Sequence, residues 1–490
     1  MKKICDLVNC DYDIEIYGIT DDSRYVKDGY LFVASKGFNV DHFDYIEDAI
    51  DKGCSFIISD RDINIDFPHI IVEKDISKLY RKICEKFYDV DFNKINMIGI
   101  TGTDGKTTTT SIIKELISDC AYIGTNGFEI KDKSFSTNNT TPVVSELYDD
   151  ISKIIKSNCK NLAMEVSSEA LLHGRVDDFR YKVVGITNIT GDHMNVHKTF
   201  DNYVLCKKKI LTLLKSEGYA VLNGDDEILT KINGKNVVKF GFNTNNDCII
   251  ENVEYLKDKT IINIKYNNEI VEINSPLKAR YNVYNVVMAY IICRLFGIDS
   301  SLLLSRIKKL RCIKGRTELL DFGQDYDIIL DYAHTINGIR NVLDSFQNYK
   351  KIITVTGCAG GREKEKRPII GKMVIDRSDV SIFTMDDPRY ESVDDIIDQM
   401  VGKNEDYIRI IDREEAIEYA LDIASKDSVV LILGKGRDNY MAINDKKVYY
   451  SDYDVISNYF KEKWDAHFFF FLTYFEIITT IELDWMLFLV

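Results

Sequence analysis

A loop with two glycines, a lysine and several threonines lies where an expected strand gives way to an expected helix. The apolar run 95–100 precedes this loop, and the helical pattern 111–117 follows it. In such a loop the glycines let backbone N–H groups approach phosphate oxygens, and the helix N-terminus presents its positive dipole end. The lysine can neutralise phosphate charge, and a threonine hydroxyl can reach Mg²⁺. The loop therefore predicts an ATP site with these contacts: Gly102, Thr103, Asp104, Gly105, Lys106, Thr107 and Thr108.

The spacing of this loop differs from that of the generic phosphate loop, whose first glycine would fall at Ile100. The alternative is a plain glycine turn with a solvated lysine. The strand and the helix on the correct sides of the loop disfavour that alternative.

Two further expected strands end in polar residues. Glu165 lies at the end of the apolar run 162–166, and Asp192 with His193 follows the run 183–188. Because the carboxyl ends of parallel strands meet at one edge of a sheet, we expect these side chains near the phosphate loop, with Glu165 as a Mg²⁺ ligand. Taken alone, Asp192 fits a helix cap beside a surface histidine.

Three consecutive lysines begin at Lys207, fourteen residues after His193. Such a run is usually a solvated helix face. The residues alone do not decide which of the three lysines belongs to the site.

These groups belong to a chain that divides into three α/β units and a tail. Residues 1–93 mix short strands with helices in a small domain. In residues 94–314, apolar strands alternate with amphipathic helices, which predicts a parallel sheet with helices on both faces and ligands at the carboxyl ends of its strands. The alternation restarts in residues 315–463 and predicts a second, independently wound Rossmann-like α/β domain.

The tail 464–490 is intensely apolar, but Glu476, Glu482 and Asp484 interrupt it before about 20 apolar residues accumulate. We expect the tail to pack on the last domain or to be poorly ordered. Attachment to a membrane surface is the less favoured alternative, and we assign the tail no catalytic role.

The composition indicates a large cytoplasmic enzyme. The chain has 490 residues and a net charge of −15, which argues against nucleic acid as its main partner. Its eleven cysteines are scattered without paired spacing, so we expect reduced thiols and no zinc site. Asp6 lies where the apolar core of a secretory signal would run, so we expect no such signal.

The order of the motifs resembles that of one family. From about residue 20 to 460 the chain carries TGTDGKTTTT, MEVSSEAL, TNITGDHMNVH, YVLCKKKIL, KARYNVYN, KGRTE, LDYAHT, GCAGGREKEKRP and MDDPRYE. The compressed phosphate loop resembles those of the Mur ligases and the folylpolyglutamate synthetases. The joint pattern resembles the UDP-N-acetylmuramoyl-tripeptide synthetases, the Mur ligases that add the third residue in peptidoglycan synthesis. The resemblance implies a uridine-type UDP-substrate domain, a central ATP-binding domain and an amino-acid-binding domain, in that order.

The resemblance also implies a modified lysine. In that family the lysine four residues after the tyrosine of the YVLCKKKIL motif is carbamylated, which corresponds to Lys207 as N6-carboxylysine. A carbamate supplies the hard oxygen ligands that Mg²⁺ prefers. The implied metal set is Thr107, Glu165, His193 and Lys207, and the implied catalytic set is Lys106, Glu165, His193 and Lys207.

Binding residues follow from the positions of the motifs. The implied contacts of the UDP-linked substrate are Ser23, Asn139, Thr140, Thr141, Ser167, His173 and Arg175, with His173 in place of a common glutamine. The implied nucleotide contacts beyond the phosphate loop are Asn285, Arg316, Asp331 and His334. The implied amino-acid contacts are Arg362, Asp386, Asp387, Pro388, Arg389, Gly434 and Asp438.

The chain departs from the family pattern near the last group. Asp387 replaces the Asn of the diaminopimelate-type signature, and Arg437 with Asp438 replaces a common His-Glu pair. Arg437 would bring another cation near the amino-acid pocket, while the shorter Asp438 retracts an acid. Arg389 still favours meso-diaminopimelate over L-lysine or another diamino acid, because a guanidinium can grip the distal carboxylate.

The implied activity is that of an ATP-dependent amide ligase that adds a diamino acid to UDP-MurNAc-L-Ala-D-Glu through an acyl phosphate. We expect a cytoplasmic monomer whose last domain closes to bring Arg362 and Arg389 to the amino acid. The alternatives are the same reaction with L-lysine, a folylpolyglutamate synthetase-like ligase, and a catalytically silent nucleotide-binding scaffold. The uridine-type domain argues against the second alternative, and the intact catalytic set argues against the third.

Overall fold

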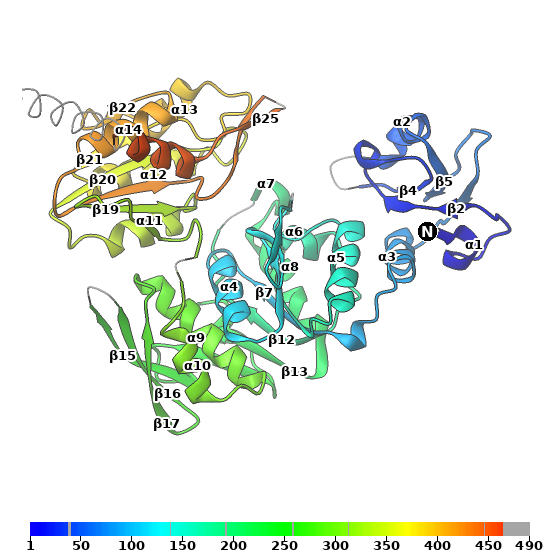
Figure 1. Cartoon of the computed structure of the whole chain (residues 1–490), viewed down its shortest axis with the longest axis horizontal. Coiled ribbons are helices and arrows are strands. Elements are labelled where there is room, and N and C mark those ends of the chain that lie inside the picture. The colour runs from blue at the N-terminus through cyan, green and yellow to red at the C-terminus, as the bar shows by residue number, and fades with distance from the viewer. Residues whose placement is uncertain are drawn as a thin grey trace, which may run out of the picture. The chain divides into compact units, whose positions relative to one another are not determined.

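The computed structural model describes residues 1–37, 41–137, 139–191, 194–256, 259–311, 313–444 and 446–463. Asp192, His193 and the tail 464–490 therefore lie outside the described residues. The chain forms two compact units (Figure 1). The first comprises residues 1–277 and 281–310, and the second comprises residues 278–280 and the chain from Arg311 on.

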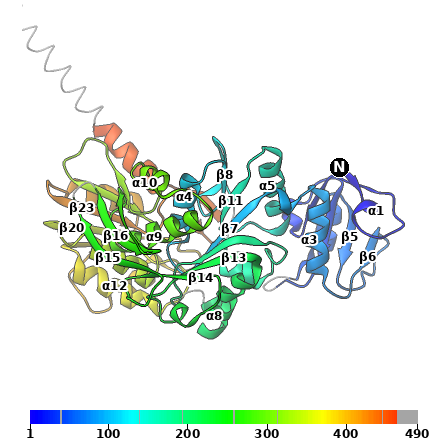
Figure 2. The ribbon, with the colours of Figure 1, turned by 90° about the horizontal axis from the view of Figure 1, so that it is seen from below.

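The first unit begins with a four-stranded parallel sheet in the order β3-β4-β5-β6. Its strands are β3 (Gly18–Thr20), β4 (Tyr30–Ala34), β5 (Cys54–Ser59) and β6 (His69–Ile71). A short ribbon and three helices accompany it: β1 (Lys2–Lys3), β2 (Glu15–Ile16), α1 (Ile4–Leu7), α2 (Ile46–Asp51) and α3 (Ile76–Phe87). The apolar face of α3 packs on α5 (Val144–Lys156) of the next sheet (Figure 2), so one hydrophobic core joins the two sheets.

The central sheet has eleven strands in the order β10-β9-β8-β11-β7-β12-β13-β14-β15-β16-β17. Its strands are β7 (Asn96–Thr101), β8 (Cys120–Gly124), β9 (Gly127–Ile130), β10 (Lys133–Phe135), β11 (Asn161–Glu165), β12 (Tyr181–Ile186), β13 (Leu214–Asn223), β14 (Val237–Gly241), β15 (Cys248–Tyr255), β16 (Thr260–Tyr266) and β17 (Glu269–Ser275). Its helices besides α5 are α4 (Lys106–Leu116), α6 (Ser168–Leu172), α7 (Met194–His197), α8 (Phe200–Lys208), α9 (Arg280–Leu295) and α10 (Ser300–Ile307).

The predicted parallel arrangement holds from β8 to β15. Both edges of the sheet are antiparallel, which the sequence analysis did not predict. At one edge Asn267 and Asn268 have φ of 53° and 62°, the left-handed pair of a two-residue hairpin turn. Such a turn can join only antiparallel strands.

The second unit is built on a six-stranded sheet in the order β18-β19-β23-β20-β21-β22, parallel except for β18. Its strands are β18 (Glu318–Leu320), β19 (Asp327–Asp331), β20 (Lys351–Thr356), β21 (Val380–Phe383), β22 (Ile408–Arg409) and β23 (Ser428–Leu433), and a hairpin of β24 (Tyr440–Ile443) and β25 (Lys446–Tyr449) follows. Helices α11 (Ile336–Ser345), α12 (Lys366–Arg377) and α13 (Val393–Val401) pack side by side. Helix α14 (Arg413–Asp422) and the helix over 452–463 share the core on one face of the sheet (Figure 1).

In the part of the chain that the structure describes, no helix combines the length and the apolar character needed to cross a membrane.

Candidate active site

The phosphate loop lies at the carboxyl end of β7, in the middle of the central sheet, and leads directly into α4. Gly102 and Gly105 have positive φ, 148° and 83°. A Cβ on Gly102 would lie 1.8 Å from Oγ1 of Thr187, and a Cβ on Gly105 would lie 2.5 Å from Oδ1 of Asn285. Only glycine therefore fits at either position without displacing a neighbour. The strand, loop and helix expected from the sequence are present.

Two lysines direct their ammonium groups at the backbone of this loop. Nζ of Lys106 donates to the carbonyl oxygens of Gly102 and Thr103, at 2.9 and 3.0 Å. Nζ of Lys207 donates to the carbonyl oxygen of Gly102 at 2.7 Å, and Lys207 is 2% exposed. Lys209 instead donates to the carbonyl oxygen of Leu171 and pairs with Asp177. Of the three consecutive lysines, Lys207 is thus the buried one beside the loop.

The Glu165 carboxylate is fully buried and accepts from four donors. Its Oε1 accepts from the Tyr122 hydroxyl (2.6 Å) and from the Thr125 N–H (2.9 Å). Its Oε2 accepts from the hydroxyls of Thr107 (2.9 Å) and Thr125 (3.2 Å). A buried carboxylate without such donors would be costly, and this cage fixes the orientation of Glu165.

This donor set fits Mg²⁺. The ion prefers hard oxygen ligands and is usually held by one or two carboxylates together with substrate phosphates and water. Glu165 and Thr107 place a carboxylate and a hydroxyl side by side at the start of α4, where the loop would hold phosphates. Among the described residues, no group of three or more His, Cys, Asp or Glu side chains could hold a metal on its own. His193 lies outside the described residues, so its part in the set stays a prediction.

Asn285 lies beside the phosphate loop. It is 5% exposed, and its Oδ1 accepts from the Thr109 hydroxyl at 3.2 Å. Its Nδ2 donates to Oδ1 of Asn282 on the same helix at 3.1 Å, and the bond from Thr109 ties α9 to α4. Two residues that directly follow β12 hold the backbone of Asp104. Its N–H donates to Oδ1 of Asn188, and its carbonyl oxygen accepts from the Thr187 hydroxyl.

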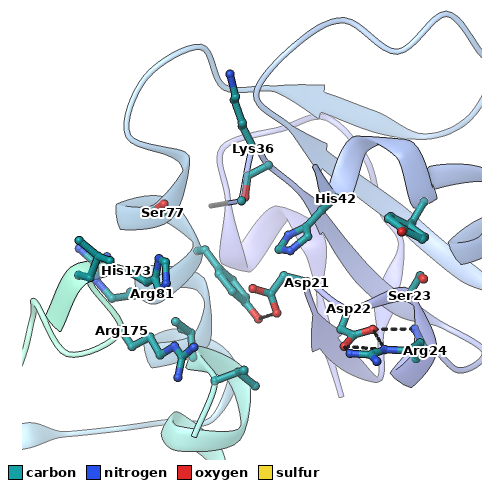
Figure 3. A pocket seen from close by; sticks show the side chains of 17 residues that line it. Asp21, Asp22, Ser23, Arg24, Lys36, His42, Ser77, Arg81, His173 and Arg175 are labelled. Atoms are coloured by element: carbon teal, nitrogen blue, oxygen red, sulfur yellow. Dashed lines mark hydrogen bonds and ion pairs between the residues drawn. The ribbon is translucent and has the colours of Figure 1, made fainter. Parts of the chain in front are cut away.

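A cavity of about 940 Å³ opens between the first sheet and the segment after α6. Figure 3 shows His173 and Arg175 on one side of this cavity, with Asp21, Ser23 and His42 on the other. Burial and the charge of Arg175 lower the pKa of His173, so this imidazole is neutral at pH 7. Of the seven predicted contacts of the UDP-linked substrate, Ser23, His173 and Arg175 line the cavity.

The other predicted substrate contacts lie near Glu165. The Thr141 hydroxyl donates to the Glu165 carbonyl oxygen and accepts from the Ser167 N–H, both at 2.9 Å. Ser167 caps α6, and the Thr140 hydroxyl lies 3.1 Å from that of Thr125. Arg175 donates to the Thr141 carbonyl oxygen at 2.9 Å, which links this group to the cavity. Asn139 is exposed, and no described contact joins its side chain to the group.

In the second unit, Asp331 organises the predicted nucleotide-side residues. It is 5% exposed, and burial raises its pKa. Its two oxygens accept from the N–H groups of Thr317 (2.6 Å) and Ala333 (2.7 Å). The adjoining Arg316 guanidinium lies 4.8 Å from the centroid of the Tyr332 ring. His334 is exposed, with its Nδ1 2.9 Å from the Tyr332 carbonyl oxygen.

The predicted amino-acid segment is a turn anchored to the hairpin of β24 and β25. Asp387 and Arg389 both have positive φ, 35° and 52°. Oδ1 of Asp387 accepts from Nζ of Lys435 (2.8 Å) and from the N–H of Ala442 (2.9 Å). The Arg389 N–H donates to the Ala442 carbonyl oxygen, and the Arg389 carbonyl accepts from the Asn444 N–H, both at 2.9 Å. The signature turn is therefore fixed by backbone contacts, which leave the Arg389 side chain available.

Arg362 and Arg389 are the two arginines of this segment that were predicted to contact the amino acid. Within the described residues, neither guanidinium makes a hydrogen bond or an ion pair. A Cβ on Gly361 would lie 3.6 Å from Nη1 of Arg389, so this guanidinium passes close to the backbone beside Arg362. A Cβ on Gly434 would lie 2.5 Å from Oδ2 of Asp386, which places that buried carboxylate against the Gly434 loop. Pro388 is also buried.

The structure corrects the expectation for Arg437. Its guanidinium forms a forked pair with Glu318, with Nε to Oε2 at 2.8 Å and Nη2 to Oε1 at 2.5 Å. It also stacks on Tyr453, with Cζ 3.5 Å from the ring centroid. Arg437 is thus no extra free cation beside an amino acid. Asp438 is drawn to Lys435, with Oδ2 3.6 Å from Nζ, and burial raises the pKa of Asp438 to about 6.

Several residues of these networks were not predicted from the sequence. Tyr122 and Thr125 orient Glu165, Lys435 holds Asp387, and Glu318 holds Arg437. Glu318 stands in the motif KGRTE, and Lys435 lies two residues before Arg437, but nothing in the spacing shows that their partners lie 119 and 48 residues away.

Three family models match the chain. "Mur ligase family, catalytic domain" matches residues 15–90, "Mur ligase middle domain" matches residues 100–293, and "Mur ligase, glutamate ligase domain" matches residues 315–436.

Two of the similar curated proteins serve as examples, and both are named UDP-N-acetylmuramoyl-L-alanyl-D-glutamate–2,6-diaminopimelate ligase. The one from Fusobacterium nucleatum is 36% identical over 476 residues, covering 92% of this chain and 95% of that protein. The one from Bacillus cereus is 35% identical over 480 residues, covering 92% and 97%. A solved structure of a ligase with the same name has a TM-score of 0.63 at 24% identity and covers 94% of this chain and 99% of that chain, a likeness of fold. With matching models in all three parts and relatives alike over nearly its whole length, this chain belongs to the Mur ligase family.

Proposed function

We propose that this chain is an ATP-dependent ligase that joins meso-diaminopimelate to UDP-MurNAc-L-Ala-D-Glu. The observation that carries the proposal is the identity of about a third, over more than nine-tenths of the chain, to relatives named for that reaction. The geometry of each predicted site supports a part of it.

The phosphate loop supports the use of ATP. Its glycines permit close backbone approach, and Lys106 lies at the first turn of α4, where its ammonium can exchange a carbonyl for a phosphoryl oxygen. Glu165, Thr107, His193 and a carbamylated Lys207 would hold Mg²⁺, which when bound neutralises charge on the phosphates. Tyr122 and Thr125 hold the Glu165 carboxylate in place.

The cavity beside the first sheet supports a UDP-linked substrate. Its lining includes Lys36 and Arg175, whose positive charges can attract a diphosphate, together with the rings of His42 and His173, which can hydrogen-bond to it. Arg175 is joined through Thr141 to the backbone of Glu165, so the substrate-binding residues and the phosphate loop belong to one network.

The amino-acid turn supports a ligand with a distal carboxylate. The uncommitted Arg389 and Arg362 can grip that carboxylate, whereas Asp386 and Asp438 offer negative charge to an ammonium group. Because Arg437 is paired with Glu318, it gives no reason to prefer another diamino acid. The side-chain ammonium of L-lysine would instead be repelled by the two free guanidinium groups.

The proposed reaction has two steps. The terminal carboxylate of the dipeptide attacks the γ-phosphorus of ATP, the bond to ADP breaks, and an acyl phosphate forms. The amine of diaminopimelate then attacks the acyl carbon, phosphate leaves, and the amine loses a proton. Lys106 can stabilise charge on the transferring phosphoryl oxygens, and the bound geometry supplies much of the remaining acceleration.

We further propose domain boundaries at 93/94 and 314/315, the cytoplasm as the location, and a monomer as the working form. The tail 464–490 lies outside the described residues and has no part in the proposal.

The test is ADP release by the full-length chain with UDP-MurNAc-L-Ala-D-Glu and either meso-diaminopimelate or L-lysine. We expect turnover with diaminopimelate, and we expect Arg389→Ala to lower kcat/KM for it by about a hundredfold through the loss of a charged forked contact. Arg377→Ala, which removes a surface arginine paired with Asp344, is the matched control. Efficient use of L-lysine, with Arg389→Ala having no effect on diaminopimelate, would overturn the assigned amino acid; no ADP release with either would overturn the ligase.

A further inference from the structure

The forked pair of Glu318 and Arg437 connects two loops of the second unit that are far apart in the sequence. Glu318 begins β18, immediately after the turn that holds Arg316, and Arg437 lies in the loop after β23. Oε2 of Glu318 also accepts from the Gly315 N–H at 2.7 Å. One carboxylate therefore holds both the turn and the loop.

The backbones of the two loops approach each other closely. A Cβ on Gly315 would lie 2.8 Å from the N atom of Arg437, and a Cβ on Gly436 would lie 3.1 Å from the Gly315 carbonyl oxygen. Gly315 and Gly436 have φ of 67° and 51°, so glycine is required by conformation as well as by space. The Gly434 N–H donates to the Asp331 carbonyl oxygen at 3.1 Å. The contact between the loops is therefore continuous.

Each loop carries residues of a different proposed site. Arg316 and Asp331 belong to the nucleotide side, whereas Lys435 and Asp438 lie beside the amino-acid turn, where Lys435 holds Asp387. A displacement of either loop would be transmitted through the fork, because Arg437 is clamped between Glu318 and the Tyr453 ring. Lysine cannot reproduce this clamp, since it has no planar pair of donors.

We infer that Glu318 and Arg437 are positioning residues that couple nucleotide binding to amino-acid binding within the second unit. The inference rests on the proposed function for the identity of the two ligands. The role of the fork is to keep the two loops in register. Coupling of this kind is reciprocal, so a change on either loop alters binding on the other.

For each variant, the experiment measures the affinity for the ligand on the other side of the fork. Arg437→Lys, on the amino-acid side, is expected to weaken binding of a non-hydrolysable ATP analogue by about fivefold in calorimetry of the full-length chain. Glu318→Gln, on the nucleotide side, is expected to raise the KM for diaminopimelate by a similar factor, with the KM for the UDP-linked substrate unchanged. The double variant should be no worse than the poorer single variant, because both remove the same fork.

Arg409→Lys is the matched control, since it makes the same substitution at an arginine that pairs with Asp394. Arg409 lies on β22, at the far edge of the same sheet. A variant that merely unfolds more easily would lower the active fraction and leave the affinities unchanged. Unchanged affinity for the analogue in Arg437→Lys, or an effect equal to that of Arg409→Lys, would overturn the coupling. Calorimetry with the analogue needs no turnover, so a wild type that binds it without ligating would refute the proposed function while still testing the fork.

Discussion

Replacing Tyr122 by phenylalanine would remove one oxygen from the cage around Glu165. Tyr122 is 1% exposed, and its hydroxyl donates to Oε1 at 2.6 Å. A buried hydrogen bond to a charged acceptor contributes about 1.5–3 kcal/mol, and the three remaining donors come from Thr125 and Thr107. We therefore expect Tyr122→Phe to cost about 2 kcal/mol, which lowers the Tm by about 4–8 °C for a domain of about 220 residues.

The same substitution should also affect Mg²⁺. With Oε1 less restrained, the carboxylate can rotate away from Thr107, and the loss of such a supporting contact typically weakens a metal site by about tenfold or more. The assay is the rate of ADP release as a function of Mg²⁺ concentration, together with the Tm without the ion. Tyr181→Phe is the matched control, because among the described residues this equally buried hydroxyl donates only to Sδ of Met164, at 3.4 Å. A lowered Tm with unchanged Mg²⁺ dependence would refute the role of Tyr122 in orienting Glu165.

Three other substitutions test the remaining sites. Lys207→Ala should abolish turnover, with partial rescue by added short-chain carboxylates, and wild-type turnover without any added acid would exclude the carbamate. Arg175→Ala should raise the KM for the UDP-linked substrate by about tenfold and leave the affinity for ATP unchanged, as calorimetry can show. Because burial raises the pKa of Asp438 to about 6, above that of an unfolded aspartate, its contribution to stability is present at low pH and lost as the pH rises from about 4 through 6. The Tm of Asp438→Asn relative to wild type should therefore be higher at pH 7.5 than at pH 4.5; an equal difference at both values would contradict this.

The sequence predicted the elements that carry the phosphate loop and Glu165 because both depend on local patterns. The apolar runs 95–100 and 162–166 became β7 and β11. The packing of α3 on α5 could not be predicted in this way, because it joins two sheets through one core. Consequently, residues 1–93 cannot be deleted without exposing that core, and the single substitution at Arg175 is the sharper test of the substrate cavity.

The roles of charged residues were harder to predict than their presence. Arg437 looks like a free cation in the sequence because Glu318 lies 119 residues away, and only the fold shows that the two are paired. Conversely, Lys207 could be chosen among three lysines only by resemblance, whereas burial beside Gly102 distinguishes it directly. Site residues that act through a partner distant in sequence are those that motif spacing alone cannot reveal.

The left-handed backbone at Arg389 has a consequence for laboratory evolution of this chain. A residue other than glycine in that conformation costs on the order of 1 kcal/mol or more, and the backbone contacts to Ala442 and Asn444 offset this cost. Selection for heat resistance alone would therefore favour glycine at position 389, since glycine adopts the conformation without strain. The same exchange would discard the guanidinium, so variants chosen only for thermal tolerance should drift toward a stable chain that no longer discriminates among its amino acids.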